Sequence, residues 1–294
     1  MVTIAEVARH AGVAVSTVSY ALSGKRSISP GTRRRVEASV RALGYQPRKN
    51  AHGVMLHLAL PGHGALGADW LGAFLGAATA TAHAGGADLL VSPSAHHRGA
   101  SGVVVVAPAS PPLDTSVPVV LVGGDAGAPA HSRVDLDRVA AGVRAANYLA
   151  DLGHRAVAFV HSGPPEDFQH GVARGARERN VALRAHCWST EVDQVFAHDR
   201  PTAVVASDDA ALAAVLEDFQ RRQLRVPEDV SVLALCSDEA ARRGRWAVTS
   251  VSVSPAALGR AAVEAVLDGR PTARLLAPRL TVRASTTPVR GVSG

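Results

Sequence analysis

The chain has 294 residues, of which 47% are hydrophobic, so it can hold a small head and one or two domains with cores of their own. No stretch reaches the roughly 18 apolar residues of a membrane span, and the amino end is polar where a signal peptide would be apolar. We therefore expect a cytoplasmic protein that does not contact membranes. Its two cysteines, Cys187 and Cys236, are too few for a disulfide framework.

Three short helices are predicted in the first 45 residues. Thr3 can cap the first helix while the Glu6 carboxylate, three residues later, accepts a hydrogen bond from the backbone amide of the cap, and Gly12 ends the helix. A second helix follows at once, and a third begins at Ser29 with Pro30 in its first turn. The apolar face of these helices is made of Ile4, Val7, Ala8, Ala11, Val18, Leu22, Val36, Val40 and Leu43.

A tight turn at Gly12 joins the first two helices, and the second has a small polar outer face, which is typical of a helix-turn-helix that enters a DNA major groove. Residues 1–50 carry nine Lys/Arg against two Glu, a net charge of +7, whereas the whole chain carries +6. The net positive charge is therefore confined to the first 50 residues, as expected for a head that binds the phosphates of double-stranded DNA.

The strings TIAEVARHAGVAVSTVSYALSG and ISPGTRRRVEASVRALGYQP resemble the DNA-binding head of the lactose-repressor (LacI) family of bacterial transcriptional regulators. In that family the start and outer face of the second helix read bases, and neighbouring groups hold phosphates. The resemblance implies base contacts from Val15, Ser16 and Tyr20. It implies phosphate contacts from Thr17, Ser19, Lys25, Arg26 and Thr32.

Two residues depart from the family pattern. Ala14 stands where the family usually has a capping serine, which weakens the second helix by about 1 kcal/mol. Tyr20 replaces a frequent arginine, so the bidentate guanine contact of arginine is absent and the preferred base stays open.

Residues 47–55 are expected to form a connector, because Pro47 breaks the preceding helix and the segment has little apolar surface. In the LacI family this connector folds into a hinge helix on DNA and inserts an apolar side chain into the minor groove; Val54 occupies that position here. Gly53 lowers helix propensity by up to about 1 kcal/mol. A plain flexible linker is the alternative.

From Leu56 onward, short apolar runs alternate with helical stretches, which indicates an α/β fold with parallel sheets. There are too many runs for one sheet, so we expect two lobes, which resemble the periplasmic-binding-protein-like core of LacI-family homodimers. The expected boundaries are 1–46 for the helix-turn-helix head, 47–55 for the hinge, about 56–155 with 249–277 for the first lobe, and about 156–248 with 278–288 for the second lobe.

One connection in the first lobe is short. Eight residues, Ser94 to Ser101, separate the apolar runs DLLVSP and GVVVVAP, whereas a parallel crossover with its helix needs a dozen residues or more. We therefore expect the first lobe to lack one crossover helix on one face. The family places a helix there that contributes to the dimer, so pairing of this chain must use other surfaces.

A small molecule is expected to bind between the lobes, where LacI-family members hold sugars or nucleobases. The resemblance places the effector contacts at Asp135, Phe168, Ser207, Asp208 and Cys236. Most of the charged side chains that the family uses are replaced at these positions, so the effector is either less polar or no longer bound. Ser207-Asp208-Asp209 can also be read as the cap of a helix.

A second class of function is suggested by Gly62 to Gly67, which match G-x-G-x-x-G between a strand and a helix, with Asp88 about twenty residues later. This pattern would make the chain a nicotinamide-binding sensor or enzyme with a DNA-binding head. Asp88, however, precedes its strand, whereas the ribose-binding acid belongs at the far end. A third possibility is an architectural DNA binder that responds to no effector.

Other polar residues favour no catalytic or metal site. His96-His97 have no Cys or acid at ligand spacing, Cys236 ends a buried strand, and Glu228-Asp229 are most simply a turn before a strand. We therefore predict a transcriptional regulator that is not an enzyme and needs no cofactor. It is expected to be a homodimeric repressor that binds a pseudo-palindromic operator through residues 1 to about 55.

Overall fold

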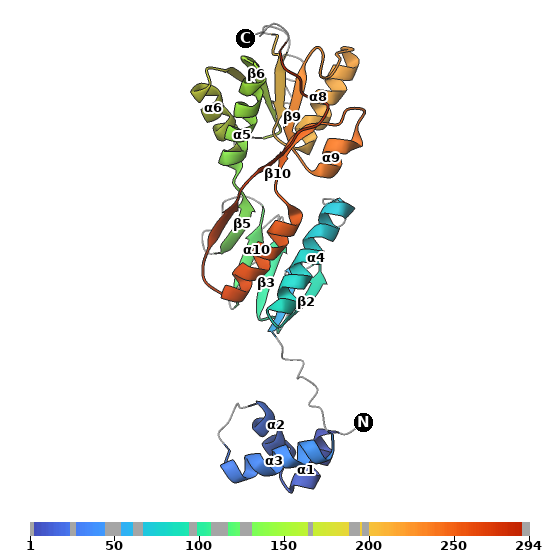
Figure 1. Cartoon of the computed structure of the whole chain (residues 1–294), viewed down its shortest axis with the longest axis vertical. Helices are drawn as coiled ribbons and strands as arrows, with labels where there is room; N and C mark the ends of the chain where they lie inside the picture. Colours follow the sequence, from blue (N-terminus) through green and yellow to red (C-terminus); the bar gives the residue numbers. More distant parts are fainter. Residues whose placement is uncertain are drawn as a thin grey trace. The chain divides into compact units, whose positions relative to one another are not determined.

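The structure is a computed structural model that describes residues 3–23, 28–44, 54–60, 67–93, 99–106, 117–123, 131–163, 167–187, 195 and 200–289. The chain divides into two compact units, Met1–Val54 and Met55–Gly294 (Figure 1). The first unit is the predicted head, and the second contains the two predicted lobes.

The head consists of three helices around a small apolar core. Thr3 and Glu6 form the predicted capping box, and Gly12 adopts φ 62°, the left-handed conformation that ends the first helix. A hydrogen bond of 3.0 Å between His10 Nδ1 and Ser39 Oγ ties the first helix to the third. The core residues are Val7, Ala8, Ala11, Val18 and Val36. The helices are α1 (Ile4–Ala11), α2 (Val15–Ser23) and α3 (Pro30–Ala42).

The first lobe is built on a six-stranded sheet with the order β11-β5-β4-β3-β1-β2. The strands from β11 to β1 pair in parallel, as the unbroken apolar runs of β3 and β4 predict. The strands are β1 (Val54–Ala59), β2 (Ala87–Ser92), β3 (Gly102–Val106), β4 (Val119–Val122), β5 (Ser132–Leu136) and β11 (Ala273–Leu276).

Two helices, α4 (Ala68–Ala84) and α10 (Pro255–Asp268), pack side by side on one face of this sheet (Figure 1). The opposite face buries Val103, Val105 and Leu121, and no described helix contributes to that cluster. Residues 93–101 join β2 to β3; the described ones among them are not helical, and residues 94–98 lie outside the described residues. Within the described chain, helices therefore cover one face, as the short connection predicts.

The second lobe has a six-stranded sheet with the order β12-β10-β9-β8-β6-β7, in which only β12 is antiparallel among the described pairs. Helices α5 and α6 pack together over one face, and α8 covers the other. The strands are β6 (Ala156–His161), β7 (Ala182–Cys187), β8 (Ala203–Ala206), β9 (Ser231–Leu235), β10 (Thr249–Ser252) and β12 (Arg279–Thr281). The helices are α5 (Arg138–Asp151), α6 (Asp167–Glu178), α8 (Asp209–Arg221) and α9 (Asp238–Arg243).

The structure moves three of the expected boundaries. Helix α5 was expected in the first lobe, but Ala141, Ala145 and Leu149 are buried in the core of the second. Strand β10 was also expected in the first lobe, but it pairs with β9 and β12. Strand β1 begins at Val54, inside the expected hinge. The chain thus passes between the lobes after β5, after β10 and after β11, and local sequence patterns do not reveal such crossings.

Glycines allow α5 and α6 to approach each other closely. An added Cβ at Gly171 of α6 would overlap the carbonyl oxygen of Val139 and lie 3.0 Å from Cα of Gly142 in α5. An added Cβ at Gly142 would in turn overlap the α6 backbone. Because backbone atoms cannot yield as side chains can, this helix pair tolerates no side chain at either position.

We expect Gly171→Ala to lower the free energy of unfolding by about 1–3 kcal/mol, the usual cost of overpacking a core. Gly76→Ala on α4 is the matched control, since an added Cβ there meets nothing within 4 Å. It should leave stability unchanged or raise it by about 0.5–1 kcal/mol, because alanine is the better helix former. Denaturant titration of both variants measures the difference; equal effects would refute the close-packing argument.

Candidate functional sites

The predicted base-reading residues lie at the start of α2 and on its outer face. Val15 keeps 47% of its surface exposed, and Ser16 is also exposed. Tyr20 is half-buried one turn later. An exposed valine beside an exposed hydroxyl offers an apolar contact for a thymine methyl group and a hydrogen bond for a base edge. Helix α2 therefore presents the two kinds of group that read a major groove.

The predicted phosphate contacts are only partly described. Thr17 and Thr32 are half-buried, and the Oγ1 of Thr32 lies 2.8 Å from the Oγ of Ser29, which caps α3. Lys25 and Arg26 lie outside the described residues, as does the side chain of Ser19. The exposed residues Arg33 to Arg35 in the first turns of α3 add cations to which the sequence analysis gave no individual role.

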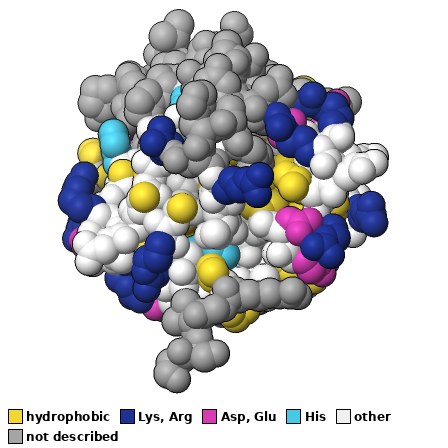
Figure 2. Space-filling model, turned by 90° about the horizontal axis from the view of Figure 1, so that it is seen from above, with side chains coloured by type: hydrophobic (Ala, Val, Ile, Leu, Met, Phe, Trp, Pro, Cys, Tyr) yellow, Lys and Arg dark blue, Asp and Glu magenta, His cyan; other side chains and the backbone are white. Residues whose placement is uncertain are grey.

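The second unit distributes its charge differently. Figure 2 shows Lys and Arg side chains spread around the visible face, several with acidic side chains beside them. Paired examples on the second lobe are Arg174–Glu178 and Arg225–Asp229, each between residues four apart. Because arginines and carboxylates of this unit pair with each other, its surface has little net positive potential. The head is therefore the part of the chain suited to binding a polyanion.

Val54, the predicted minor-groove residue, is the first residue of β1 and is 40% exposed. A strand position does not present a helical wedge, so insertion into DNA would require Val54 to leave the strand. Residues 45–53, which hold the remainder of the expected hinge, lie outside the described residues.

A cleft of about 660 Å³ lies between the two lobes. Its walls are formed where β5, β8, β9 and β10 end and by the first turns of α4, α5, α8 and α9, so the carboxyl ends of both sheets open into it. This is the usual ligand-binding edge of a parallel α/β sheet. The lining residues that the following paragraphs use are Asp69, Trp70, Asp135, Arg138, Ser207, Asp208, Asp209, Cys236, Asp238, Glu239, Arg242 and Arg279.

Four of the five predicted effector residues line this cleft: Asp135, Ser207, Asp208 and Cys236. Asp135 is buried, and its carboxylate accepts hydrogen bonds from Arg133 and from the amide of Leu136, each at 2.7 Å. Phe168 does not line the cleft. Its side chain is 1% exposed and packs in the core of the second lobe, with its ring centre 5.8 Å from that of Phe159.

Asp208 caps α8 and Asp209 is its first residue, and the pKa values of their carboxyl groups are shifted in opposite directions. Burial by itself would raise the pKa of Asp208, but hydrogen bonds from the hydroxyls of Ser162 and Ser207 and from two α8 amides outweigh it and lower the pKa. Asp208 is thus the predicted helix cap. Burial raises the pKa of Asp209, although Ser237 donates to both of its oxygens.

Cys236 behaves as a packed thiol. Burial raises its pKa to about 12, and the charge of Asp209 acts in the same direction. The thiolate required of a nucleophile or a metal ligand is therefore absent at neutral pH. This agrees with the expectation that Cys236 ends a buried strand without an activated role.

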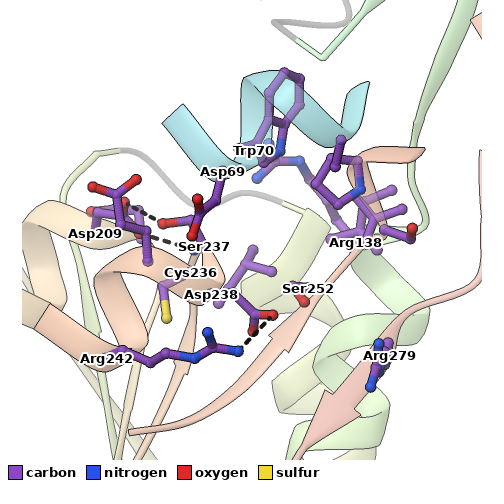
Figure 3. A pocket seen from close by; sticks show the side chains of 18 of the residues that line it. Asp69, Trp70, Arg138, Asp209, Cys236, Ser237, Asp238, Arg242, Ser252 and Arg279 are labelled. Carbon is purple, nitrogen blue, oxygen red and sulfur yellow. Dashed lines mark hydrogen bonds and ion pairs between the residues drawn. The ribbon is translucent and has the colours of Figure 1, made fainter. Parts of the chain in front are cut away.

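Charged and aromatic residues that the sequence analysis did not assign to the cleft dominate its walls. Figure 3 shows Trp70 and Asp69 from α4, Arg138 from α5, Arg242 from α9 and Arg279 from β12 around the space. The Trp70 ring is held by stacking on Phe74 at 5.0 Å between ring centres, nearly parallel at 9°. These residues add charged and aromatic groups to the cleft at positions outside the five that the family resemblance gave.

Little in the sequence indicated that Trp70 and the three arginines would line the cleft. Trp70 comes three residues after the last glycine of the Gly62–Gly67 motif, in the first turn of α4. The arginines come from three different elements, and only the meeting of the lobes brings those elements to one cavity.

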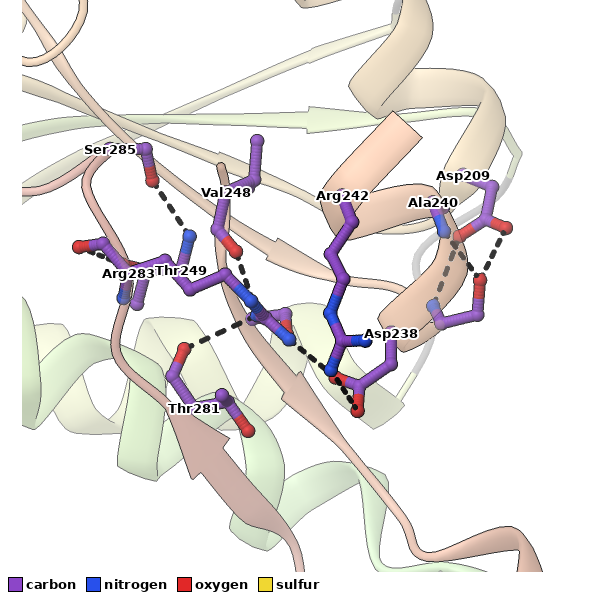
Figure 4. A network of polar contacts seen from close by, with 11 residues as sticks. Asp209, Asp238, Ala240, Arg242, Val248, Thr249, Thr281, Arg283 and Ser285 are labelled. Atoms are coloured by element: carbon purple, nitrogen blue, oxygen red, sulfur yellow. Dashed lines mark hydrogen bonds and ion pairs between the residues drawn. The ribbon is translucent and has the colours of Figure 1, made fainter. Parts of the chain in front are cut away.

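Arg283 ties the wall of the cleft to the segments that cross between the lobes (Figure 4). Its side chain is 10% exposed, and its guanidinium donates to the carbonyl oxygen of Val248, the hydroxyl of Ser250 and the carboxylate of Asp238. Asp238 begins α9 and also lies 3.7 Å from Arg242. A buried, fully bonded arginine of this kind fixes α9 relative to β10.

The remaining motifs take the places expected of structural residues. Asp229 accepts hydrogen bonds from Arg225 in the turn before β9, and Asp88 lies at the amino end of β2. His96-His97 and the first five residues of the glycine motif lie outside the described residues. Among the residues that the structure does describe, no group of His, Cys, Asp and Glu is arranged to hold a metal ion. None of the described helices is long and apolar enough to span a bilayer.

A helix-turn-helix head followed by a two-lobed core with a cleft between parallel sheets is the architecture of ligand-responsive transcriptional regulators. Comparison with known protein families agrees. Residues 3–48 match the model of bacterial regulatory proteins of the lacI family, and residues 146–286 match a periplasmic binding protein-like domain. The chain thus combines a LacI-family helix-turn-helix domain with a periplasmic-binding-protein-like core, and its relatives are LacI-family transcriptional regulators.

Individual relatives extend the match over the whole chain. The HTH-type transcriptional regulator CelR of Thermobifida fusca is 28% identical over 333 residues, which covers 98% of this chain and 94% of the relative. The lac repressor dimer bound to operator and the anti-inducer ONPF superposes with a TM-score of 0.64 at 20% identity, covering 97% and 99% of the two chains. A CelR–cellobiose complex gives a TM-score of 0.58 at 23% identity, covering 97% and 100%. The relatives are regulators, which confirms the prediction of a regulator that is not an enzyme.

We expect Asp208→Ala to lower the free energy of unfolding by about 1–2 kcal/mol at neutral pH, because four donors lose their acceptor. Since the pKa of Asp208 is lowered, its ionised form stabilises the fold above the ordinary value of 3.8, and that contribution is lost as pH falls through the lowered pKa. When the free energy of unfolding is measured across pH, Asp208→Ala should therefore lose less stability than the wild type as the pH falls.

Asp209→Asn is the matched control. Because the pKa of Asp209 is raised, its ionised form opposes folding at neutral pH, and the substitution should cost clearly less than that of Asp208. Equal losses for the two neighbours would contradict the assigned hydrogen bonds.

Proposed function

We propose that this LacI-family regulator is a homodimeric repressor whose two heads bind a pseudo-palindromic operator and whose interlobe cleft binds a small polar effector. The observation that carries the proposal is the placement of an exposed, base-compatible α2 surface on the one part of the chain with a large positive charge. A homodimer presents two such heads, and its two-fold symmetry matches that of a palindrome.

Affinity and sequence preference are assigned to different residues. Arg33 to Arg35 are exposed and sit beside the cap of α3, where they can neutralise phosphates of any duplex. Val15, Ser16 and Tyr20 are assigned to bases, since they start α2 and lie on its outer face. Tyr20 offers one hydroxyl where an arginine would offer a bidentate fork, so its contribution to specificity is smaller.

Val54 is assigned to the minor groove at the centre of the operator. Its exposure is the support, because an apolar side chain that is 40% exposed loses water when it enters a base step. Its place in β1 means that the first strand must release one residue when the hinge forms on DNA.

The effector is assigned to the cleft on the strength of its volume and lining. A space of about 660 Å³ holds a molecule of the size of a mono- or disaccharide or a nucleoside. Trp70 offers a flat face, and Arg138, Arg242 and Arg279 offer hydrogen-bond donors to hydroxyls or to anionic groups. Because these are not the expected family positions, we propose an altered effector site. The cellobiose complex of CelR shows that a relative binds a sugar.

Effector binding and DNA binding are coupled through the three crossings between the lobes. A ligand that touches both walls changes the angle between the lobes, and the first lobe is the one that begins directly after the head. The spacing of the two heads in the dimer then changes, which alters the fit to two half-sites.

We expect selection from a random DNA pool to return a pseudo-palindrome. Ser16→Ala and Tyr20→Ala should reduce the preference for that site by roughly tenfold or more, with little change in binding to random DNA. Arg34→Ala should weaken binding to both duplexes and reduce the dependence of log affinity on log salt by about one. Fluorescence anisotropy over a salt series measures all three variants.

Arg174→Ala in the second lobe removes an equal charge that does not belong to the head, and it should leave every duplex affinity unchanged. Equal losses on operator and random DNA for Ser16→Ala would contradict its assignment. If the protein bound none of the selected sites better than bulk DNA, the proposed function itself would be contradicted.

A thermal-shift screen of sugars, nucleosides and small metabolites should identify a compound that raises the unfolding temperature by several degrees at high excess over its Kd. Trp70→Leu should remove most of that shift, because the compound loses its stacking surface. Trp246→Leu is the control, since Trp246 packs against Arg245 in the second lobe and does not line the cleft. If no compound stabilised the protein, the result would favour an architectural DNA binder without an effector.

A further inference from the structure

One contact joins the lobes across the mouth of the cleft. Gly67 precedes α4 in the first lobe, and Glu239 lies in α9 of the second. An added Cβ at Gly67 would overlap Oε2 of Glu239, so the carboxylate touches the backbone at the start of α4. Both residues flank the cleft: Glu239 lines it, and α4 contributes Asp69 and Trp70 from its first turn (Figure 3).

The Glu239 carboxylate is only half satisfied. One oxygen, Oε1, accepts a hydrogen bond from Arg243 on the same helix. The other, Oε2, is buried and has no hydrogen-bond partner among the residues that the structure describes. A buried carboxylate oxygen without a donor is unfavourable, so a small movement that supplies a donor lowers the free energy.

The start of α4 has no side-chain cap among the residues that the structure describes. The first four amides of an α-helix have no partner within the helix. Gly67 occupies the capping position and has no side chain to accept from them, while its carbonyl oxygen accepts a hydrogen bond from the amide of Leu71 at 2.9 Å. The partial positive charge at the start of this 17-residue helix also favours an anion.

We propose that Glu239 is a latch between the lobes: closure of the cleft brings its Oε2 onto the first-turn amides of α4, and this contact holds the closed state. Arg243 holds the other carboxylate oxygen, Oε1, through its hydrogen bond on the same helix. The Arg283–Asp238 pair fixes α9 to β10, so α9 moves together with the second lobe. Glycine at position 67 leaves room for this contact, because a side chain there would displace the carboxylate.

This latch regulates the effector cleft and in that role rests on the proposed function, yet the contact itself needs neither DNA nor effector. Its test is therefore amide hydrogen exchange of the full-length protein alone, read on peptides that cover residues 67–75. The free protein also samples the closed state, so Glu239→Ala should accelerate exchange of the first α4 turn by up to roughly fivefold, through loss of the cap that forms on closure. Gly67→Ala should do the same, because the new methyl group displaces the carboxylate.

The double variant Gly67→Ala/Glu239→Ala decides between a latch and two separate local effects. If one contact carries both effects, the double variant exchanges no faster than either single variant. Rates that multiply, or a Glu239→Ala variant with wild-type exchange in α4, would overturn the proposal. Glu178→Ala is the control, since it removes a similar pair with Arg174 on α6 and should leave α4 unchanged.

The regulatory role has its own readout. The effector identified by thermal shift should protect the same α4 peptide in the wild type and protect it less in Glu239→Ala. If amide exchange in α4 changed in the variants but not on addition of effector, the contact would stand and its role in regulation would be rejected. Failure to find an operator would reject the proposed function and leave the exchange results standing.

Discussion

The carboxyl ends of two parallel sheets face each other in this protein, and the cleft, its lining and its connection to the head follow from that constraint. A parallel strand ends where the next helix begins, so each wall is made of strand ends and first helical turns. First turns carry free amides and capping side chains, which explains why Asp208, Asp209 and Asp238 lie at the cleft. The same arrangement brings the start of α4 opposite Glu239.

Close backbone packing makes the lobes rigid enough for movement to be transmitted. Gly142 and Gly171 let α5 and α6 meet backbone to backbone, and Gly259 of α10 packs equally closely on Phe74 of α4. Helices held in this way shift as units with their sheets. Arg283 extends the rigid unit to α9, so contacts that a ligand makes with α9 act on the crossing segments.

The two units differ in how their charges are arranged, and this difference suits them to different ligands. The head carries excess positive charge on exposed arginines, whereas the core pairs most of its arginines with nearby carboxylates. Unpaired charge favours binding to any duplex, and paired charge at the cleft favours selective recognition of a small molecule with matching groups. The buried thiol of Cys236 and the capped carboxylate of Asp208 show that not every polar residue at this cleft is available to a ligand.

The sequence by itself determined the head, the α/β class and the regulatory function, because helix caps, glycine stops and apolar runs are local and leave their pattern in consecutive residues. The family resemblance in the sequence also pointed to Asp135, Ser207, Asp208 and Cys236, which line the cleft. Only the tertiary structure placed α5 and β10 in the second lobe, buried Phe168 in its core and brought Trp70, Arg138, Arg242 and Arg279 to one cavity. Those features depend on the chain crossing between the lobes three times, and contacts between residues so distant in sequence have no local signature.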